Sequence, residues 1–297
     1  MRKNIHQNIN GNTKNDLEHK VLSNETQDKS FRFATFTHID FFLQDARMLL
    51  NNGFVVVLLG AVKENYSDNK SMLLFFSQND SRLEACKDII DRGQYFSFHP
   101  VLFKGNNLKS RFKRFGFLDY STTESLLLKD EEQHIVKALL HLIAEESKND
   151  ADGMSADILF SYTELLLQHM NRFYQRWFND RFEEICAIDR EYQDLLIHTF
   201  KPNEKNTGRL PSLTVFARKL QLTSCYLNDI SQIVSGQTAQ ERIEVKVIDA
   251  AKQLLASTNL SVAEVADRLG FSQPQSLNRL FKRKTQITPL EYRISIT

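Results

Sequence analysis

The sequence predicts an α+β protein of several domains: a small β domain, a helical region, and an all-α C-terminal domain with two helix-turn-helix units. Three observations support this prediction. A chain of 297 residues is long for one compact core. Short apolar runs give way to helical periodicity after about residue 120, and a helical pattern occurs twice in the last third of the chain.

Charge is distributed unevenly along the chain. The formal net charge is +1, yet residues 208–297 contain 12 Lys and Arg against 7 Asp and Glu, which leaves 26 against 30 for the preceding residues. A basic C-terminal third indicates that only this end of the chain is suited to bind a polyanion.

Cysteine use and hydropathy limit the class of protein. Cys86, Cys186 and Cys225 are far apart, which predicts reduced thiols in the cytoplasm and argues against a disulfide framework or a zinc site. The apolar run at 54–62 is too short to span a membrane, so we expect no membrane partner. Residues 1–30 lack Phe, Trp and Tyr and the apolar centre of a signal peptide, which predicts a disordered tail.

Residues 31–120 are expected to form the β domain. Apolar and aromatic runs are separated there by polar segments, and they read FRFATF, FVVVLLGAV, SMLLFFS, YFSFHPVLF and RFKRFGFL. Runs of this kind are typical of a small sheet, sandwich or barrel. VVVLL and LLFF would also suit a buried helix.

Residues 121–200 are expected to form a helical linker or dimerisation region. Helical spacing of apolar residues predicts helices at 130–147, 155–179 and 183–200. One stripe of the second helix could be either core or a dimer surface, and it consists of Tyr162, Leu166, His169, Phe173 and Trp177. The segment KPNEKNTGR at 201–209 has no apolar residue and is predicted to be a linker.

Residues 210–297 contain the internal repeat. Apolar residues at i, i+3, i+4 and i+7 occur in both copies, 49 positions apart: Leu213, Phe216, Ala217 and Leu220, then Val262, Val265, Ala266 and Leu269. After a short turn, each copy continues into a second helix with LNDI or LNRL. A repeated helix, turn and helix is the pattern of two helix-turn-helix units.

Capping signals predict where these helices begin. Gly270 suits a sharp turn that needs positive φ, and Pro274 falls in the first turn of a helix, where its missing N–H is tolerated. Thr223 is expected to cap one helix, and capping boxes are expected from Thr238 with Glu241, Ser261 with Glu264, and Ser272 with Gln275. The helix between the two units, 238–256, would span roughly 27 Å.

The helix predicted at 273–285 has two different faces. Leu277, Leu280 and Phe281 form an apolar face that should pack on the preceding helix. The opposite stripe carries residue types that hydrogen-bond to base edges or phosphates in DNA, namely Gln275, Asn278, Arg279 and Lys282. A solvated polar face is the alternative, but the position in a basic helix-turn-helix favours DNA recognition.

In the first unit, the corresponding outward residues are Cys225, Asn228 and Asp229. Asp229 stands where the second unit has Arg279. An acid does not stabilise a phosphate, although it can accept a hydrogen bond from cytosine. We therefore expect this helix to enter a groove and to contribute less affinity.

The stretches SLTVFARKLQLTSCYLNDISQIVSGQT and LSVAEVADRLGFSQPQSLNRLFKRKTQITPLEYR resemble the DNA-binding domain of the AraC family of transcription regulators. The resemblance implies base-facing positions at Cys225, Asn228 and Asp229 in the first unit and at Pro274, Gln275, Asn278 and Arg279 in the second. Two positions depart from the family pattern. Leu277 stands where an aromatic residue is common, and Gln286 replaces the usual glycine.

Residues 31–120 resemble the cupin-like sensor domain of such regulators, although SQND stands where the usual proline-glycine turn is expected. The resemblance implies a bacterial, cytoplasmic regulator with double-stranded DNA as partner. It also implies a small-molecule effector or a homodimer as the means of control, and contact with RNA polymerase if the protein is an activator.

No catalytic, metal or cofactor site is expected. His38 and His99 are the only histidines of the β domain, and no nucleotide-binding or nucleophile motif is present. The rival hypothesis is a small-molecule-binding or catalytic cupin-like protein whose C-terminal domain is an interaction module.

Overall fold

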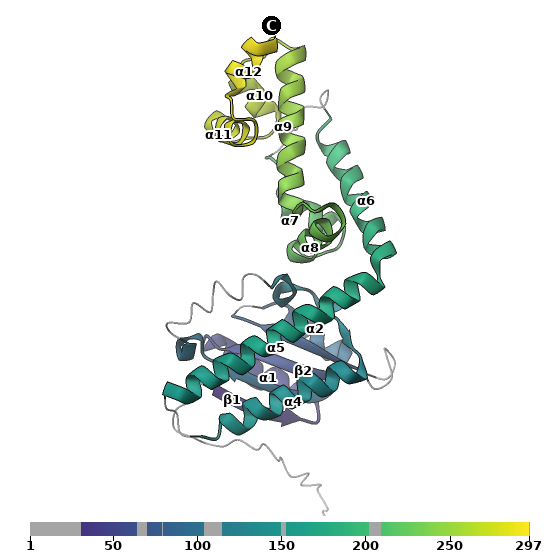
Figure 1. The fold of residues 1–297 in the computed structure, drawn as a ribbon, viewed down its shortest axis with the longest axis vertical. Coiled ribbons are helices and arrows are strands. Elements are labelled where there is room, and N and C mark those ends of the chain that lie inside the picture. Colours follow the sequence, from purple (N-terminus) through teal and green to yellow (C-terminus); the bar gives the residue numbers. More distant parts are fainter. Residues whose placement is uncertain are drawn as a thin grey trace, which may run out of the picture.

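The computed structural model describes residues 31–63, 70–78, 80–103, 115–149, 153–201 and 209–296. Figure 1 shows a sheet with helices packed on it at one end of the molecule and a helical C-terminal domain at the other, with helix α6 running beside that domain. The expected tail at 1–30 and most of the expected linker at 201–209 lie outside the described residues.

The described strands form one antiparallel sheet in the order β1-β4-β2-β3-β5. The strands are β1 (Phe31–Phe36), β2 (Val55–Val62), β3 (Ser71–Phe76), β4 (Ile90–Phe98) and β5 (Leu127–Leu128). Four of the five apolar runs therefore contain strands, as predicted. The prediction was wrong for the described end of RFKRFGFL, because Gly116–Asp119 forms a 3-10 turn, η2.

Two helices of this region were not predicted, α1 (Ile39–Asn51) and α2 (Arg82–Ile89). They cover one face of the sheet, and α4 (Asp130–Glu146) and α5 (Gly153–Asp180) cover the other (Figure 1). Alternate residues of β2 enter the two cores: Val57 and Leu59 face α4 and α5, whereas Val56 and Leu58 face α1 and α2. Burial on both faces explains why VVVLL is continuously apolar. Of the sheet, sandwich and barrel that the apolar runs allowed, the described residues form a single sheet between two layers of helices.

The helices predicted at 130–147, 155–179 and 183–200 are confirmed as α4, α5 and α6 (Phe182–Thr199). The stripe of α5 is core. Leu166 and Phe173 are buried against the sheet, and Tyr162 and Trp177 pack at the margin of the same cluster.

The C-terminal domain contains both predicted helix-turn-helix units. Its helices are α7 (Leu213–Lys219), α8 (Ser224–Ser235), α9 (Ala239–Ser257), α10 (Val262–Arg268), α11 (Pro274–Thr285) and α12 (Pro289–Ile296). The apolar residues of the repeat share one core, in which Phe216 and Leu227 come from the first unit and Val265, Leu277 and Phe281 from the second.

Helix starts follow the predicted caps with one exception. Thr223 accepts a hydrogen bond from the backbone of α8, and capping boxes form at Thr238 and Ser261. The predicted box of Ser272 and Gln275 is wrong, because α11 has Gln273 as its N-cap and Pro274 as its first residue. A residue before proline is driven into the extended conformation, and Gln273 has φ −142° and ψ 131°.

The turns of the two units correspond closely. Gly270 has the expected positive φ of 86°, and Gln221 takes the same region in the first unit with φ 59°. Gly236 ends α8 with φ 72°, and Gln286 ends α11 with φ 68°. Gln286 therefore adopts the left-handed conformation of the glycine that it replaces.

Helix α6 contributes to two cores. Ile185 packs with the sheet domain, whereas Tyr192, Leu196 and Phe200 pack with Phe216 of the C-terminal domain. The Tyr192 hydroxyl donates to the carbonyl of Ala239 at 2.7 Å, which joins α6 to the start of α9. A buried ion pair between Asp189 of α6 and Arg242 of α9 adds a second connection.

Candidate nucleic-acid interface

The predicted base-reading stripe of the second unit lies on an exposed surface of α11. Gln275, Asn278, Arg279 and Lys282 are all exposed, and Leu277 and Phe281 on the opposite face are fully buried. Within the described part of the chain, the four polar side chains make no hydrogen bond or ion pair at their polar ends. Their arrangement follows from the i, i+3, i+4 and i+7 spacing on a helix fixed by its apolar side.

Two further basic residues of α11 have a different role. Arg283 and Lys284 both form ion pairs with Glu244 of α9, at 2.7 and 2.9 Å. These contacts hold α11 against the long helix between the two units. Glu244 was not predicted from the sequence as a partner of α11, because no local rule relates it to Arg283 and Lys284 39 and 40 positions later.

The predicted base-facing residues of the first unit have different surroundings. Cys225, Asn228 and Asp229 are half-buried on α8. Asp229 accepts a hydrogen bond from the Tyr120 hydroxyl at 2.5 Å, and the Cys225 thiol donates to Asp119 at 3.7 Å. Both partners belong to the sheet domain, so α8 is covered where α11 is open.

Burial changes the ionisation of this contact. Loss of solvent raises the pKa of Asp229, although the hydrogen bond from Tyr120 opposes the rise. Burial, together with the neighbouring charges of Asp119 and Asp229, raises the pKa of the Cys225 thiol to about 11. Burial also raises the pKa of Tyr120, which remains a neutral hydrogen-bond donor. Burial is the largest cause of each shift, so the contact is largely withdrawn from solvent.

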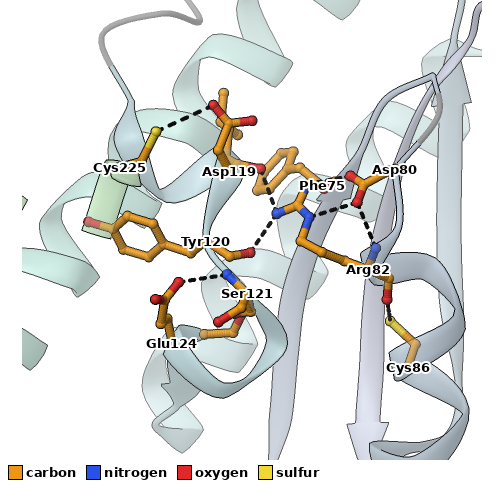
Figure 2. Close-up of polar contacts among 11 residues, drawn as sticks. Phe75, Asp80, Arg82, Cys86, Asp119, Tyr120, Ser121, Glu124 and Cys225 are labelled. Atoms are coloured by element: carbon orange, nitrogen blue, oxygen red, sulfur yellow. Dashed lines mark hydrogen bonds and ion pairs between the residues drawn. The ribbon is translucent and has the colours of Figure 1, made fainter. Parts of the chain in front are cut away.

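The N-terminus of α8 is held by a second acid of the sheet domain. Glu124 is buried and lies in the 3-10 turn η3 (Thr122–Glu124). It accepts hydrogen bonds from the Thr223 backbone N–H at 2.7 Å and from the Thr223 hydroxyl at 2.8 Å. It also accepts from the Ser121 N–H at 2.8 Å, as Figure 2 shows. A carboxylate at a helix N-terminus is favourable, because unpaired N–H groups and the helix dipole attract negative charge.

Apolar packing joins α8 to the sheet domain as well. Tyr226 and Ile230 belong to the core that covers α5 and the sheet. The Tyr226 ring stacks on Phe178 at 5.8 Å between centroids and meets Tyr120 edge-on at 5.0 Å. Trp177 lies 6.0 Å from the same ring. Sequence periodicity did not indicate these contacts, because the partners come from distant parts of the chain.

The two histidines of the sheet domain lie just outside the ends of α1 and β4. His38 accepts from the Asp40 N–H at the start of α1, and His99 accepts from the Val101 N–H, so both imidazoles make local structural contacts. In the ranges that the structure describes, no three His, Cys, Asp or Glu side chains group as a metal site. Likewise, no described helix combines the length and the apolar character needed to cross a bilayer.

Comparison with known families finds one match. Residues 216–295 match the family described as "Helix-turn-helix domain", a range that runs from α7 to α12 and includes both units. A search of curated proteins found no match.

Solved structures similar to this chain include regulators and their domains. The C-terminal domain of the two-component response regulator yesN from Fusobacterium nucleatum is 28% identical, with 36% of this chain and 98% of that chain covered and a TM-score of 0.31. A transcriptional regulator of the AraC-type DNA-binding group from Chromobacterium violaceum is 18% identical, with coverages of 37% and 96% and a TM-score of 0.31. Apo ToxT from Vibrio cholerae is 12% identical, with coverages of 91% and 99% and a TM-score of 0.30.

Proposed function

Because residues 216–295 form a helix-turn-helix domain of AraC type, we propose that the protein is a transcription regulator that binds DNA sequence-specifically. The observation that carries the proposal is the stripe of α11, where four residues with the chemistry of base and phosphate recognition are exposed side by side. The basic balance of residues 208–297 supports the same partner.

In this proposal α11 enters the major groove. Arg279 offers a planar pair of N–H donors that matches O6 and N7 of guanine, and Asn278 and Gln275 offer the donor and acceptor pair that matches adenine. Lys282, one turn further along, provides a point charge for a phosphate. Pro274 starts the helix and lies beside this surface.

We propose that α8 reads a second, adjacent major groove with Cys225, Asn228 and Asp229. The 19 residues of α9 separate the two units by about 28 Å. Successive major grooves on one face of DNA are ~34 Å apart. DNA bending or oblique docking of the helices would account for the difference.

The sheet domain would serve as the regulatory part. We propose that a small effector or dimerisation acts through it, as expected for a cupin-like sensor domain, with RNA polymerase as a further partner if the protein activates transcription. No catalytic step is assigned to the chain, and a bacterial cytoplasm is the expected location.

The test compares two residues of the stripe with one charge outside it. In full-length protein, Arg279→Ala should weaken binding to a selected site by about 1–3 kcal/mol and relax the preference at one base pair. Lys282→Ala should weaken binding to all duplexes alike and lower the slope of affinity against salt by about 1. Arg92→Ala removes an exposed charge from the sheet domain and should leave both properties unchanged.

Fluorescence anisotropy with selected and random duplexes at several salt concentrations provides these values. Equal losses on both duplexes for Arg279→Ala would remove its base-reading role. Binding by the wild type with no dependence on salt, or no binding at all, would refute the proposed function.

A further inference from the structure

In this structure the sheet domain covers the N-terminal end and the outward side chains of helix α8. The N-terminal residues of a recognition helix approach the base edges in a helix-turn-helix complex. In this protein, the N-terminal turn of α8 is already bound to a carboxylate, because Glu124 accepts from both the N–H and the hydroxyl of Thr223. A phosphate or base edge would have to displace that carboxylate.

The side chains proposed to read bases are covered as well. Tyr120 donates to Asp229, and Asp119 accepts from Cys225. Gly116 lies so close to Asp229 that a Cβ at position 116 would collide with the carboxyl group. The covering residues all come from one segment, Gly116–Glu124, which contains η2 and η3.

This segment is fixed to the sheet domain by Arg82, a half-buried arginine of α2. The Arg82 guanidinium donates to the carbonyls of Leu118 at 2.9 Å and Tyr120 at 2.5 Å. It also donates to the carbonyl of Phe75 at 2.7 Å and forms an ion pair with Asp80. Figure 2 shows Arg82 between Asp80 and the backbone of the segment, while the Tyr120 ring points the other way, toward the helix that carries Cys225. The segment is therefore part of the sheet domain in its packing.

We propose that segment Gly116–Glu124 is an autoinhibitory contact that holds α8 away from DNA. The inference rests on the proposed function. In the closed arrangement only α11 is available, so the protein reads one groove. Release of the segment frees α8 and allows the two-groove complex. Because only the open fraction binds both grooves, the apparent affinity for a two-groove site falls by that fraction.

A reversible covalent bond between the two parts tests the proposal. Asp119 is exposed, and its carboxylate lies 3.7 Å from the Cys225 sulfur. In full-length Asp119→Cys protein, oxidation should link the segment to α8 by a disulfide, which mass spectrometry identifies. The probe is a duplex of about 40 base pairs, longer than two helical turns, recovered from a random library by the reduced variant.

The oxidised variant should lose roughly tenfold or more in affinity and protect one helical turn in a footprint. Reduction should restore the affinity and protection over two turns. Wild-type protein under the same oxidant is the control and should not change.

A second variant tests the same contact without introducing a disulfide. Tyr120→Phe removes the hydrogen bond to Asp229 and retains the ring, so it should raise affinity for the same duplex by about tenfold, as expected for the loss of a hydrogen bond to a carboxylate. Its matched control is Tyr95→Phe. Tyr95 is also buried and donates to Asp45 at 2.9 Å, but it faces α1 on the other side of the sheet. Tyr95→Phe should leave the affinity unchanged.

The outcomes separate the inference from the function on which it rests. Two-turn protection by the disulfide-linked form, or equal affinities for Tyr120→Phe and Tyr95→Phe, would overturn the autoinhibitory contact and leave DNA binding intact. Absence of binding by every form, including the reduced one, would overturn the proposed function and this inference with it.

Discussion

Substitution of Arg242 by methionine would leave the carboxylate of Asp189 without its ion-pair partner between α9 and α6. Arg242 and Asp189 are only 8% and 5% exposed. The guanidinium also donates to the Ser231 hydroxyl at 3.0 Å. Methionine fills a similar volume, so the main loss is electrostatic. Removing one member of a buried ion pair leaves the other charge without a partner and lowers the free energy of unfolding by about 3–5 kcal/mol. In a protein of this size, that loss lowers Tm by roughly 10 °C.

Thermal and urea unfolding followed by circular dichroism would measure this loss. The matched control is Arg283→Met, which breaks the ion pair with Glu244 where the Arg283 side chain is 63% exposed. An exposed pair contributes about 0–1 kcal/mol. Combining Arg242→Met with Asp189→Leu removes both charges and should recover most of the stability. If Arg242→Met were no more destabilising than Arg283→Met, the pair would not be desolvated as described.

Three further predictions concern the helix ends and the contact of α8. Gln286→Gly should raise the free energy of unfolding by about 0.5–1 kcal/mol, because φ 68° disfavours any residue with a Cβ; an unchanged urea midpoint would contradict this. Iodoacetamide should label Cys225 on the order of a hundredfold more slowly in the folded than in the urea-unfolded protein, because a thiol with a pKa of about 11 is rarely ionised at neutral pH. Peptide-resolved mass spectrometry measures the two rates, and equal rates would show that the thiol is not buried. Burial raises the pKa of Asp229, so protonation of this carboxyl stabilises the α8 contact. The stabilisation is fully present below the ordinary carboxyl pKa of about 4, and it is lost as pH rises through the raised pKa. The emission of Trp177, which lies beside Tyr226, should shift to longer wavelength over that window, and Asp229→Asn should abolish the shift.

Local signals in the sequence were sufficient to predict the helices of the C-terminal domain and their buried faces. The spacing of Leu277 and Phe281 determined which side of α11 is buried, and it thereby placed Arg279 on the exposed side. The cap at Thr223 was equally local. Helix α1 was not predicted, although Phe42, Leu43 and other apolar residues recur at helical spacing in it, because it lies between two runs rich in the aromatic and β-branched residues that favour strands.

The contact of α8 with the sheet domain could not be predicted from the sequence. Tyr120 and Asp229 are 109 positions apart, and Glu124 and Thr223 are 99 apart. No periodicity or capping rule relates residues at such separations. Asp229, which stands where the other unit has arginine, was the one sequence feature indicating that the two helices differ in role. The structure explains the acid, because Asp229 accepts a hydrogen bond from Tyr120 of the sheet domain.

The division of α6 between two cores affects where the chain can be cut. A fragment that begins at residue 209, after the expected linker, lacks Tyr192, Leu196 and Phe200, which pack against Phe216 in the C-terminal core. Its unsatisfied apolar surface would favour aggregation. We therefore expect that a stably folding C-terminal fragment has to begin within α6, upstream of the composition change at residues 201–209.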